Sequence, residues 1–413
     1  MLQYSTKIGT IVFARRRPEQ LGSGQPSLRF MPSLRQRPLF LTRLLPWVGF
    51  GGLVLTSLGA APTEPLLIRL AGQALIQHDL RQVAPAKMAA LRAELNGADV
   101  VFTDLETVID AGKGRPTRES RFFHAAKPVV LDCLKEAGFN LLALGNNHAW
   151  DLGADGVLAT IREVAARDFV HAGTGADLAA ASAPAVIITP RGRVALVAFA
   201  TGKIAAGGAA AVDRAGVNEV RRGADGEVDP IDAARVFAGI QEAGRSADLV
   251  IAYQHDHEWE PDNRVTPAWK QRFARACIDA GASLFVSHGA PLLHGIEIYR
   301  GRPIFYDLGG LIFHTVTAPG YYDPAVWESV LADAEYIGGK LSALRLRPMV
   351  LNEMGEGAPP QPRFYATRGV PARATGAPAR AILDRLADLS AGYGTKFIIT
   401  EDTAVLELPP GAP

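Results

Sequence analysis

The stretch FNLLALGNNHAWDLGADGV, residues 139–157, joins a short apolar run to a cluster of polar side chains. The apolar part has the length of a buried strand, and Gly145 indicates a tight turn after it. Asn147 offers a carbonyl oxygen to a divalent cation, and His148 can hold or protonate an oxygen of a substrate. Asp151 can orient His148 or cap the next helix. The stretch therefore predicts either a reactive strand end or a capped turn, and both interpretations remain open here.

Helical and strand patterns alternate along the rest of the chain. Residues 90–109, 231–260 and 267–290 each show helical spacing of apolar residues, followed by a short apolar run. Alternation of this kind predicts an α/β fold whose strands are buried on both faces.

Four of the predicted strands end in polar residues: VVFTDLE, LLALGNNH, LVIAYQHDHE and LFVSHGAP. Because sites in α/β sheets form outside the carboxyl ends of strands, we expect these polar groups to meet at one edge. Five residues are the candidate metal ligands: Glu106, Asn147, His255, His257 and His288.

His255 and His257 are two residues apart, so on a strand their imidazoles share one face. Two imidazoles on one face are half of a site for zinc, iron or manganese. A solvated strand end is the alternative for this pair. Helix capping or a salt bridge is the alternative for Asp104 and Glu106, which also share a face.

The first 43 residues carry eight basic side chains and one acidic one, Glu19. Residues 44–58 have no charge and precede the small residues GAAP. Counted from Met31, this arrangement is typical of a signal peptide, whereas the leader counted from Met1 is too long. We expect residues 1–61 to be a basic leader with a signal peptide or anchor, and the protein to be exported, periplasmic or anchored at the outer face. A leader on a cytoplasmic protein is the alternative.

The remaining composition is that of a globular protein, with 48% apolar residues and a net charge of +1. This charge gives no support for a nucleic-acid partner. Cys133 and Cys277 lie in apolar helical patterns, which favours two buried free thiols. A change to Pro- and Gly-rich sequence predicts a main domain at residues 62–333 and a strand, loop and helix extension at 334–413 that packs on it.

These stretches resemble the CapA-type poly-γ-glutamate capsule biosynthesis proteins, a branch of the calcineurin-like metallophosphoesterase superfamily. The resemblance runs from Leu66 to Phe313, and NNHxxDxG and GIEIYxGxPIFYxLG carry it. It implies a four-layer α/β/β/α sandwich with a metal centre at the strand ends. It also implies that His148 lies near the scissile phosphate, with Asp151 beside it, and that the metal ligands include Glu106, Asn147, His255 and His288.

The chain departs from the family pattern at several positions. Gly72-Gln73 stands where the family has Gly-Asp, and Gly289 and Pro291 stand where family histidines do. The chain gains at most His257 and His78 in exchange. Two-metal chemistry needs a full bridging set, so we expect one divalent ion, Mn, Fe or Zn, rather than two. A centre without metal is the alternative.

The leading interpretation is a capsule biosynthesis protein that acts as a metal-dependent hydrolase on an anionic polymer or a phosphoester. Membrane-bound capsule synthesis subunits are the expected protein partners. Gln73, Asn146 and Arg118, the last in the basic loop GRPTRESR, are the candidate substrate-binding residues. A non-catalytic binding or assembly subunit with a degenerate metal site is the alternative. His124, His171 and His314 are expected to have no role.

Overall fold

The computed structural model describes residues 64–118, 122–259 and 261–407, and two β-sheets dominate this part of the chain. The first sheet has nine strands in the order β20-β21-β18-β17-β1-β3-β6-β7, with β19 paired to β18. Its strands are β1 (Leu66–Leu70), β3 (Val100–Asp104), β6 (Leu141–Ala143), β7 (Val170–Ala172), β17 (Glu328–Ile337), β18 (Lys340–Leu351), β19 (Pro371–Arg373), β20 (Phe397–Thr400) and β21 (Thr403–Leu406).

The second sheet has six strands in the order β14-β15-β13-β12-β10-β9. They are β9 (Ala185–Thr189), β10 (Gly192–Thr201), β12 (Leu249–Asp256), β13 (Leu284–His288), β14 (Ile296–Tyr299) and β15 (Arg302–Phe305). Short pairs complete the β-structure of the described residues: β2 (Gln73–Leu75) with β16 (Gly310–Phe313), β4 (Val108–Ile109) with β5 (Ala125–Ala126), and β8 (Thr174–Gly175) with β11 (Gly216–Val217).

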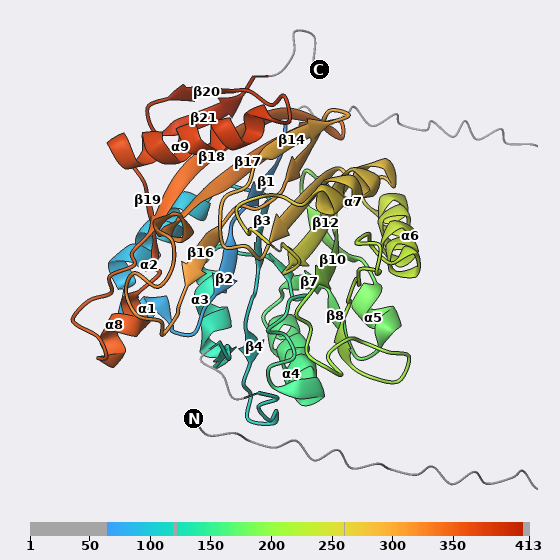
Figure 1. Ribbon diagram of the computed structural model, residues 1–413, viewed down its shortest axis with the longest axis horizontal. Helices are drawn as coiled ribbons and strands as arrows, with labels where there is room; N and C mark the ends of the chain where they lie inside the picture. Colours follow the sequence, from blue (N-terminus) through green and yellow to red (C-terminus); the bar gives the residue numbers. More distant parts are fainter. Residues whose placement is uncertain (1–63, 119–121, 260, 408–413) are drawn as a thin grey trace, which may run out of the picture. The chain divides into compact units, whose positions relative to one another are not determined.

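Helices cover the outer faces of both sheets (Figure 1). α2 (Pro85–Leu95) and α3 (Val129–Ala137) pack on the first sheet, and α6 (Pro230–Ser246) and α7 (Ala268–Asp279) pack on the second. The other helices are α1 (Leu80–Val83), α4 (Gly153–Ala165), α5 (Leu178–Ser182), α8 (Pro362–Thr367), α9 (Gly376–Ala391) and the 3₁₀ turn η1 (Pro324–Trp327).

Successive side chains of a strand point to opposite faces of its sheet, and this alternation gives the layers. In β3, Val100 and Phe102 point into the core between the sheets, whereas Val101 packs against the helices on the other face. In β12, Ile251 and Tyr253 face the core between the sheets. The expected four-layer α/β/β/α sandwich is therefore confirmed, with strands buried on both faces.

The parallel strands of both sheets fix where the site lies. β1, β3, β6 and β7 are parallel neighbours in the first sheet, and β10, β12, β13 and β15 are parallel neighbours in the second. Carboxyl ends of parallel strands meet at one edge, so each sheet presents its polar strand ends together.

The expected domain boundary between residues 333 and 334 falls inside β17. β17 pairs with β1 along Leu66–Leu70 and with β18 along most of its length, so both strands belong to the first sheet. α9 contributes Ile382, Leu383 and Leu386 to the core between the sheets. The C-terminal residues are thus part of the sandwich. The expected leader and signal peptide, residues 1–61, lie outside the described residues. Within the described ranges, no helix is long and apolar enough to cross a membrane.

Cys133 and Cys277 are buried free thiols, as expected. They lie on α3 and α7, in the helical layers on opposite sides of the sandwich.

Replacing Asp333 by Ala is expected to destabilise the fold by about 3 kcal/mol, because it leaves the buried Arg69 guanidinium without its counter-ion. Arg69 Nε donates to Asp333 Oδ1 at 2.6 Å, and Arg347 Nη2 approaches the same oxygen at 3.3 Å. Urea unfolding of the two proteins measures the difference. Asp384→Ala removes an exposed pair with Arg380 and is the control, expected to change stability by less than about 1 kcal/mol. Equal small losses in both variants would contradict the prediction.

Candidate metal centre

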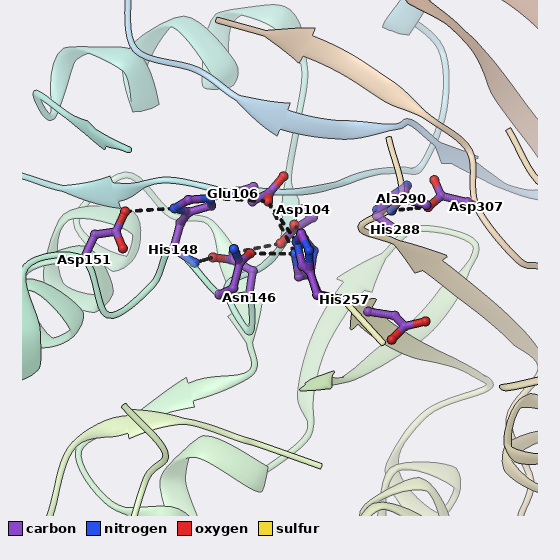
Figure 2. Close-up of polar contacts among 12 residues, drawn as sticks. Asp104, Glu106, Asn146, His148, Asp151, His257, His288, Ala290 and Asp307 are labelled. Carbon is purple, nitrogen blue, oxygen red and sulfur yellow. Dashed lines mark hydrogen bonds and ion pairs between the residues drawn. The ribbon is translucent and has the colours of Figure 1, made fainter. Parts of the chain in front are cut away.

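The five candidate ligands stand at the carboxyl ends of four strands, or just beyond them. Glu106 follows β3, Asn147 follows β6, His255 lies near the end of β12, and His288 ends β13. Figure 2 shows Asp151, His148, Glu106 and Asp104 in one row along these strand ends, with His257 beside Glu106. The structure brings Glu106, Asn147, His255 and His257 together, and His288 ends the strand next to that of His255.

Glu106, His255 and His257 form a compact cluster of potential ligand atoms. One atom from each residue lies within 4.8 Å of the others. Glu106 Oε1 is 3.4 Å from His255 Nε2 and 3.8 Å from His257 Nε2. The site lies among buried groups, since Glu106 and His255 expose 2% and 0% of their surface.

Asn147 brings a fourth potential ligand atom to this cluster. Its Oδ1 lies 2.9 Å from His255 Nε2. Two ligand atoms that each bind an ion at about 2.1 Å, at right angles, are about 3.0 Å apart. The separations of Asn147 Oδ1, His255 Nε2 and Glu106 Oε1 therefore match those around one cation.

Asp104 fixes the orientation of His255. The two-residue period that points Phe102 between the sheets also points Asp104 there, and it faces His255 from the opposite sheet. Asp104 Oδ2 lies 3.1 Å from His255 Nδ1 as an ion pair, and Nε2 is turned toward Glu106 and Asn147. A carboxylate behind a histidine holds a metal ligand in this way in many sites.

The pKa values of the two histidines in the cluster are shifted in opposite directions. Burial opposes a charge on His255, but the carboxylates of Glu106 and Asp104 outweigh it and raise the pKa of His255 to about 10. Burial lowers the pKa of His257 to about 4. A neutral His257 that faces a carboxylate is suited to bind a metal, because imidazole binds metals in its neutral form.

Several buried polar atoms at the site have no partner within the described chain: Gln73 Oε1, Glu106 Oε2, His257 Nδ1 and His257 Nε2. Buried polar atoms without hydrogen bonds are destabilising, by about 1–3 kcal/mol each. An ion coordinated by Glu106 and His257 would satisfy part of this set. The residues present therefore fit a divalent metal.

His148 stands beside the cluster and is held from behind. Its Nδ1 is 2.8 Å from Asp151 Oδ2, and its Nε2 is 3.8 Å from Glu106 Oε1. Arg118 Nη2 approaches Asp151 Oδ1 at 2.5 Å, and the His124 backbone N–H donates to Asp151 Oδ2 at 2.8 Å. Asp151 therefore orients His148 rather than capping α4, whose N-terminus has no side-chain cap.

His288 is outside the group of three ligand atoms, although it pairs in register with His255 on the neighbouring strand (Figure 2). Its Nδ1 lies 3.2 Å from the Tyr253 hydroxyl, and burial lowers its pKa to about 3. Its Nε2 is buried without a partner among the described residues, so a role as a ligand stays a prediction.

Gly289 and Pro291 stand at the two positions where the family pattern has histidines, and neither offers a side-chain ligand. Gly289 has a φ of +131°, and a Cβ there would lie 2.0 Å from the Asp256 carbonyl oxygen. No other residue fits without a shift of the backbone. Pro291 lines the cavity in front of the cluster and offers no side-chain ligand.

A cavity of about 340 Å³ opens in front of the cluster. Among the candidates from the sequence, it is lined by Gln73, Glu106, Arg118, Asn147, His148 and His257. Asn146 does not line it. The Asn146 amide donates to Asp104 Oδ1 and Leu105 O and accepts from the His148 backbone N–H. The expected substrate contact of Asn146 is thus replaced by a role in bracing the strand ends.

Several lining residues are not apparent from the sequence: Phe122, His124, Lys203, Trp259, Asn263, Phe313 and Tyr322. The His124 ring lies edge-on to the His148 ring, with 4.4 Å between the ring centres. The sequence did not predict this contact with a candidate catalytic residue. His78, expected as a replacement ligand, does not line the cavity and packs against His314 at 5.1 Å.

Comparison with known proteins places these residues within one family pattern. Residues 68–315 match the family described as "Bacterial capsule synthesis protein PGA_cap". The uncharacterised protein y4sH of Sinorhizobium fredii is 28% identical over 408 residues, covering 76% of this chain and 87% of that protein.

Two named capsule proteins match a shorter part. PGA biosynthesis protein CapA of Bacillus subtilis is 29% identical over 53% of this chain and 58% of that protein. Capsule biosynthesis protein CapA of Bacillus anthracis is 29% identical over 53% of this chain and 51% of that protein. The match therefore spans about half the length of these two relatives.

Solved structures with related arrangements include one described as a novel phosphatase from Mycoplasma pneumoniae, with 15% identity, a TM-score of 0.39, and coverage of 70% of this chain and 87% of that one. The NAD nucleotidase of Haemophilus influenzae has 13% identity, a TM-score of 0.36, and coverage of 78% and 56%.

Proposed function

The chain belongs to the bacterial capsule synthesis protein family PGA_cap, and from this premise we propose that it is a metal-dependent hydrolase of an anionic capsule-type polymer or a phosphoester. Poly-γ-glutamate is the polymer that we propose first. One observation carries the proposal. Three potential ligand atoms, from Glu106, Asn147 and His255, converge at separations that suit one cation, next to a histidine held by Asp151.

Glu106, Asn147, His255 and His257 would hold the ion. A set of one carboxylate, one amide oxygen and two imidazoles suits manganese, iron or zinc. A bound ion would polarise an oxygen of the scissile group and lower the pKa of a water molecule. We propose one ion, because Gln73 supplies a neutral amide where a second carboxylate would be needed.

The side chains around the ion would transfer a proton to the leaving group and hold the proton donor in position. Asp151 keeps Nδ1 of His148 occupied, so Nε2 is the nitrogen that faces the cavity. From there His148 can give a proton to the leaving group as the bond breaks. Arg118 ties Asp151 to the loop that precedes β5, and so holds the orientation of this pair.

A second candidate function is a non-catalytic subunit that binds the polymer. The orphaned Gln73 amide and the glycine and proline at 289 and 291 favour it, because each stands where an additional ligand would be. Membrane-bound capsule synthesis subunits are the partners that we propose for either function. We also propose that the protein is exported, which suits a protein of capsule synthesis.

Removing the metal is expected to abolish hydrolysis and to lower thermal stability together. Full-length protein loaded with Mn²⁺ would be assayed with p-nitrophenyl phosphate and with poly-γ-glutamate, before and after dialysis against EDTA. Ion at 100 times its dissociation constant stabilises the fold by about 2.7 kcal/mol, which scanning calorimetry detects without any assay of activity. Restored Mn²⁺ should recover both properties. Metal-dependent stability without cleavage of either compound would favour the binding subunit, and unchanged stability would remove the metal from the proposal.

A further inference from the structure

One basic side chain on the cavity wall, that of Lys203, is not part of the metal centre described above. Among the lining side chains that the structure describes, Glu106 is the acidic one, and Arg118 and Lys203 are the basic ones. Arg118 is paired with Asp151, whereas Lys203 forms no ion pair with any residue in the described ranges. Within the described part of the cavity wall, Lys203 is therefore the basic side chain without an ion pair.

Lys203 is held in place by an unusual backbone. It follows β10 directly after Gly202, and both residues are left-handed, with φ of 77° for Gly202 and 54° for Lys203. Glycine or asparagine adopts this conformation with less strain than lysine. A strained residue that lines a cavity is an indication of function, because the strain persists only where the surrounding structure imposes it.

Trp259 supports the Lys203 side chain and links it to the metal centre. Lys203 Nζ lies 4.9 Å from the centre of the Trp259 ring, and that ring lies 4.4 Å from the ring of His257. The ammonium group is thus separated from the candidate ligand His257 by one aromatic ring.

Hydrogen bonds hold the two residues that precede Trp259. The His257 backbone N–H donates to Thr201 O at 2.8 Å, and the Glu258 backbone N–H donates to Asp256 Oδ1 at 2.8 Å. Glu258 pairs with Arg222 at 3.2 Å, so this carboxylate has a cationic partner other than Lys203. The chain that leads from β12 to Trp259 is therefore held in place, and the exposed Lys203 side chain lies over this ring.

We propose that Lys203, supported by Trp259, binds a second acidic group of the substrate, next to the group at the metal centre. The cavity then selects molecules with repeated negative charges over single anions. This inference rests on the proposed function, because the first acidic group is taken to lie at the metal. It identifies the substrate as a polyanion and assigns a specificity role to Lys203.

The test compares ligands with one and with two or more acidic groups. Isothermal titration calorimetry on the Mn²⁺-loaded full chain would use propylphosphonate against propane-1,3-bisphosphonate, and glutamate against γ-linked tetraglutamate. Lys203→Met is expected to weaken binding of the bisphosphonate and the tetraglutamate about 5- to 10-fold and to leave the single anions unchanged, since one charge-assisted hydrogen bond is lost. Lys203→Arg should retain the preference. Lys340→Met removes an exposed lysine at the start of β18 and is the control.

The outcomes separate this inference from the proposed function. Equal weakening of single and multiple anions in Lys203→Met, or no preference for the bisphosphonate in the unaltered protein, would overturn the second subsite. If the bisphosphonate preference depends on Lys203 but tetraglutamate does not bind, the subsite stands and poly-γ-glutamate is the wrong polymer. Thermal melting of Lys203→Met must match the unaltered protein, so that a folding defect is not read as lost binding.

Discussion

Replacing His255 by Ala is expected to remove the metal and all metal-dependent hydrolysis. His255 is fully buried, its Nδ1 faces Asp104, and its Nε2 faces both Glu106 and Asn147. Loss of a group behind a ligand typically weakens metal binding 10–100-fold, so loss of the ligand itself should weaken it by at least about 100-fold. Metal analysis of the dialysed protein and calorimetric titration with Mn²⁺ measure the effect.

His257→Ala separates two interpretations of the second histidine. His257 Nε2 lies 3.8 Å from Glu106 Oε1, and neither ring nitrogen has a partner among the described residues. We therefore expect its loss to reduce bound metal about as much as the loss of His255. Unchanged metal in His257→Ala, beside a complete loss in His255→Ala, would mean that His257 only shapes the cavity wall.

His171→Ala is the matched control for both variants. His171 lies on β7 and does not line the cavity, and burial lowers its pKa as it does for His257. The control should keep its metal. Metal loss in all three variants would indicate a general effect of removing a buried imidazole and would contradict the assignment of a specific centre.

The sequence predicted the strand ends because they depend on a local feature, an apolar run followed by polar residues. Apolar runs in β3, β6, β12 and β13 place polar residues at their carboxyl ends, and parallel pairing brings those ends together. The two-residue period of a strand places Asp104 opposite His255, but this pairing joins two different sheets. No local pattern specifies which strand of one sheet faces which strand of the other.

The cavity wall was less predictable, since turns and loops form it. Lys203 and Trp259 come from the ends of β10 and β12, and they meet because those strands are parallel neighbours. His124 reaches the cavity from a loop whose position depends on Asp151. His288 stands at the predicted strand end beside its register partner His255, and its Nδ1 contacts the Tyr253 hydroxyl. The strand pattern predicted that His288 lies at the carboxyl end of a strand. Side-chain packing, which the pattern does not predict, determines which groups its ring contacts.

Replacing His148 by Asn is expected to lower turnover about 10²- to 10⁴-fold while the metal remains bound. The imidazole lies beside Glu106 but is held by Asp151, not by the candidate ligands, so its loss should leave metal binding unchanged. The free-energy barrier would rise by about 3–5 kcal/mol, at about 1.4 kcal/mol for each factor of ten.

The dependence on the leaving group tests the role of His148 most directly. A proton donor matters little when p-nitrophenolate leaves, because that anion is stable without a proton, and matters greatly when an alkoxide or amine leaves. His148→Asn should therefore reduce cleavage of an alkyl phosphate or a γ-glutamyl amide far more than cleavage of p-nitrophenyl phosphate. Asp151→Asn should show the same selectivity with a smaller loss, since the imidazole remains but loses its orientation. Equal losses for good and poor leaving groups would assign His148 to substrate binding instead, and the proton would have to come from another group on the cavity wall.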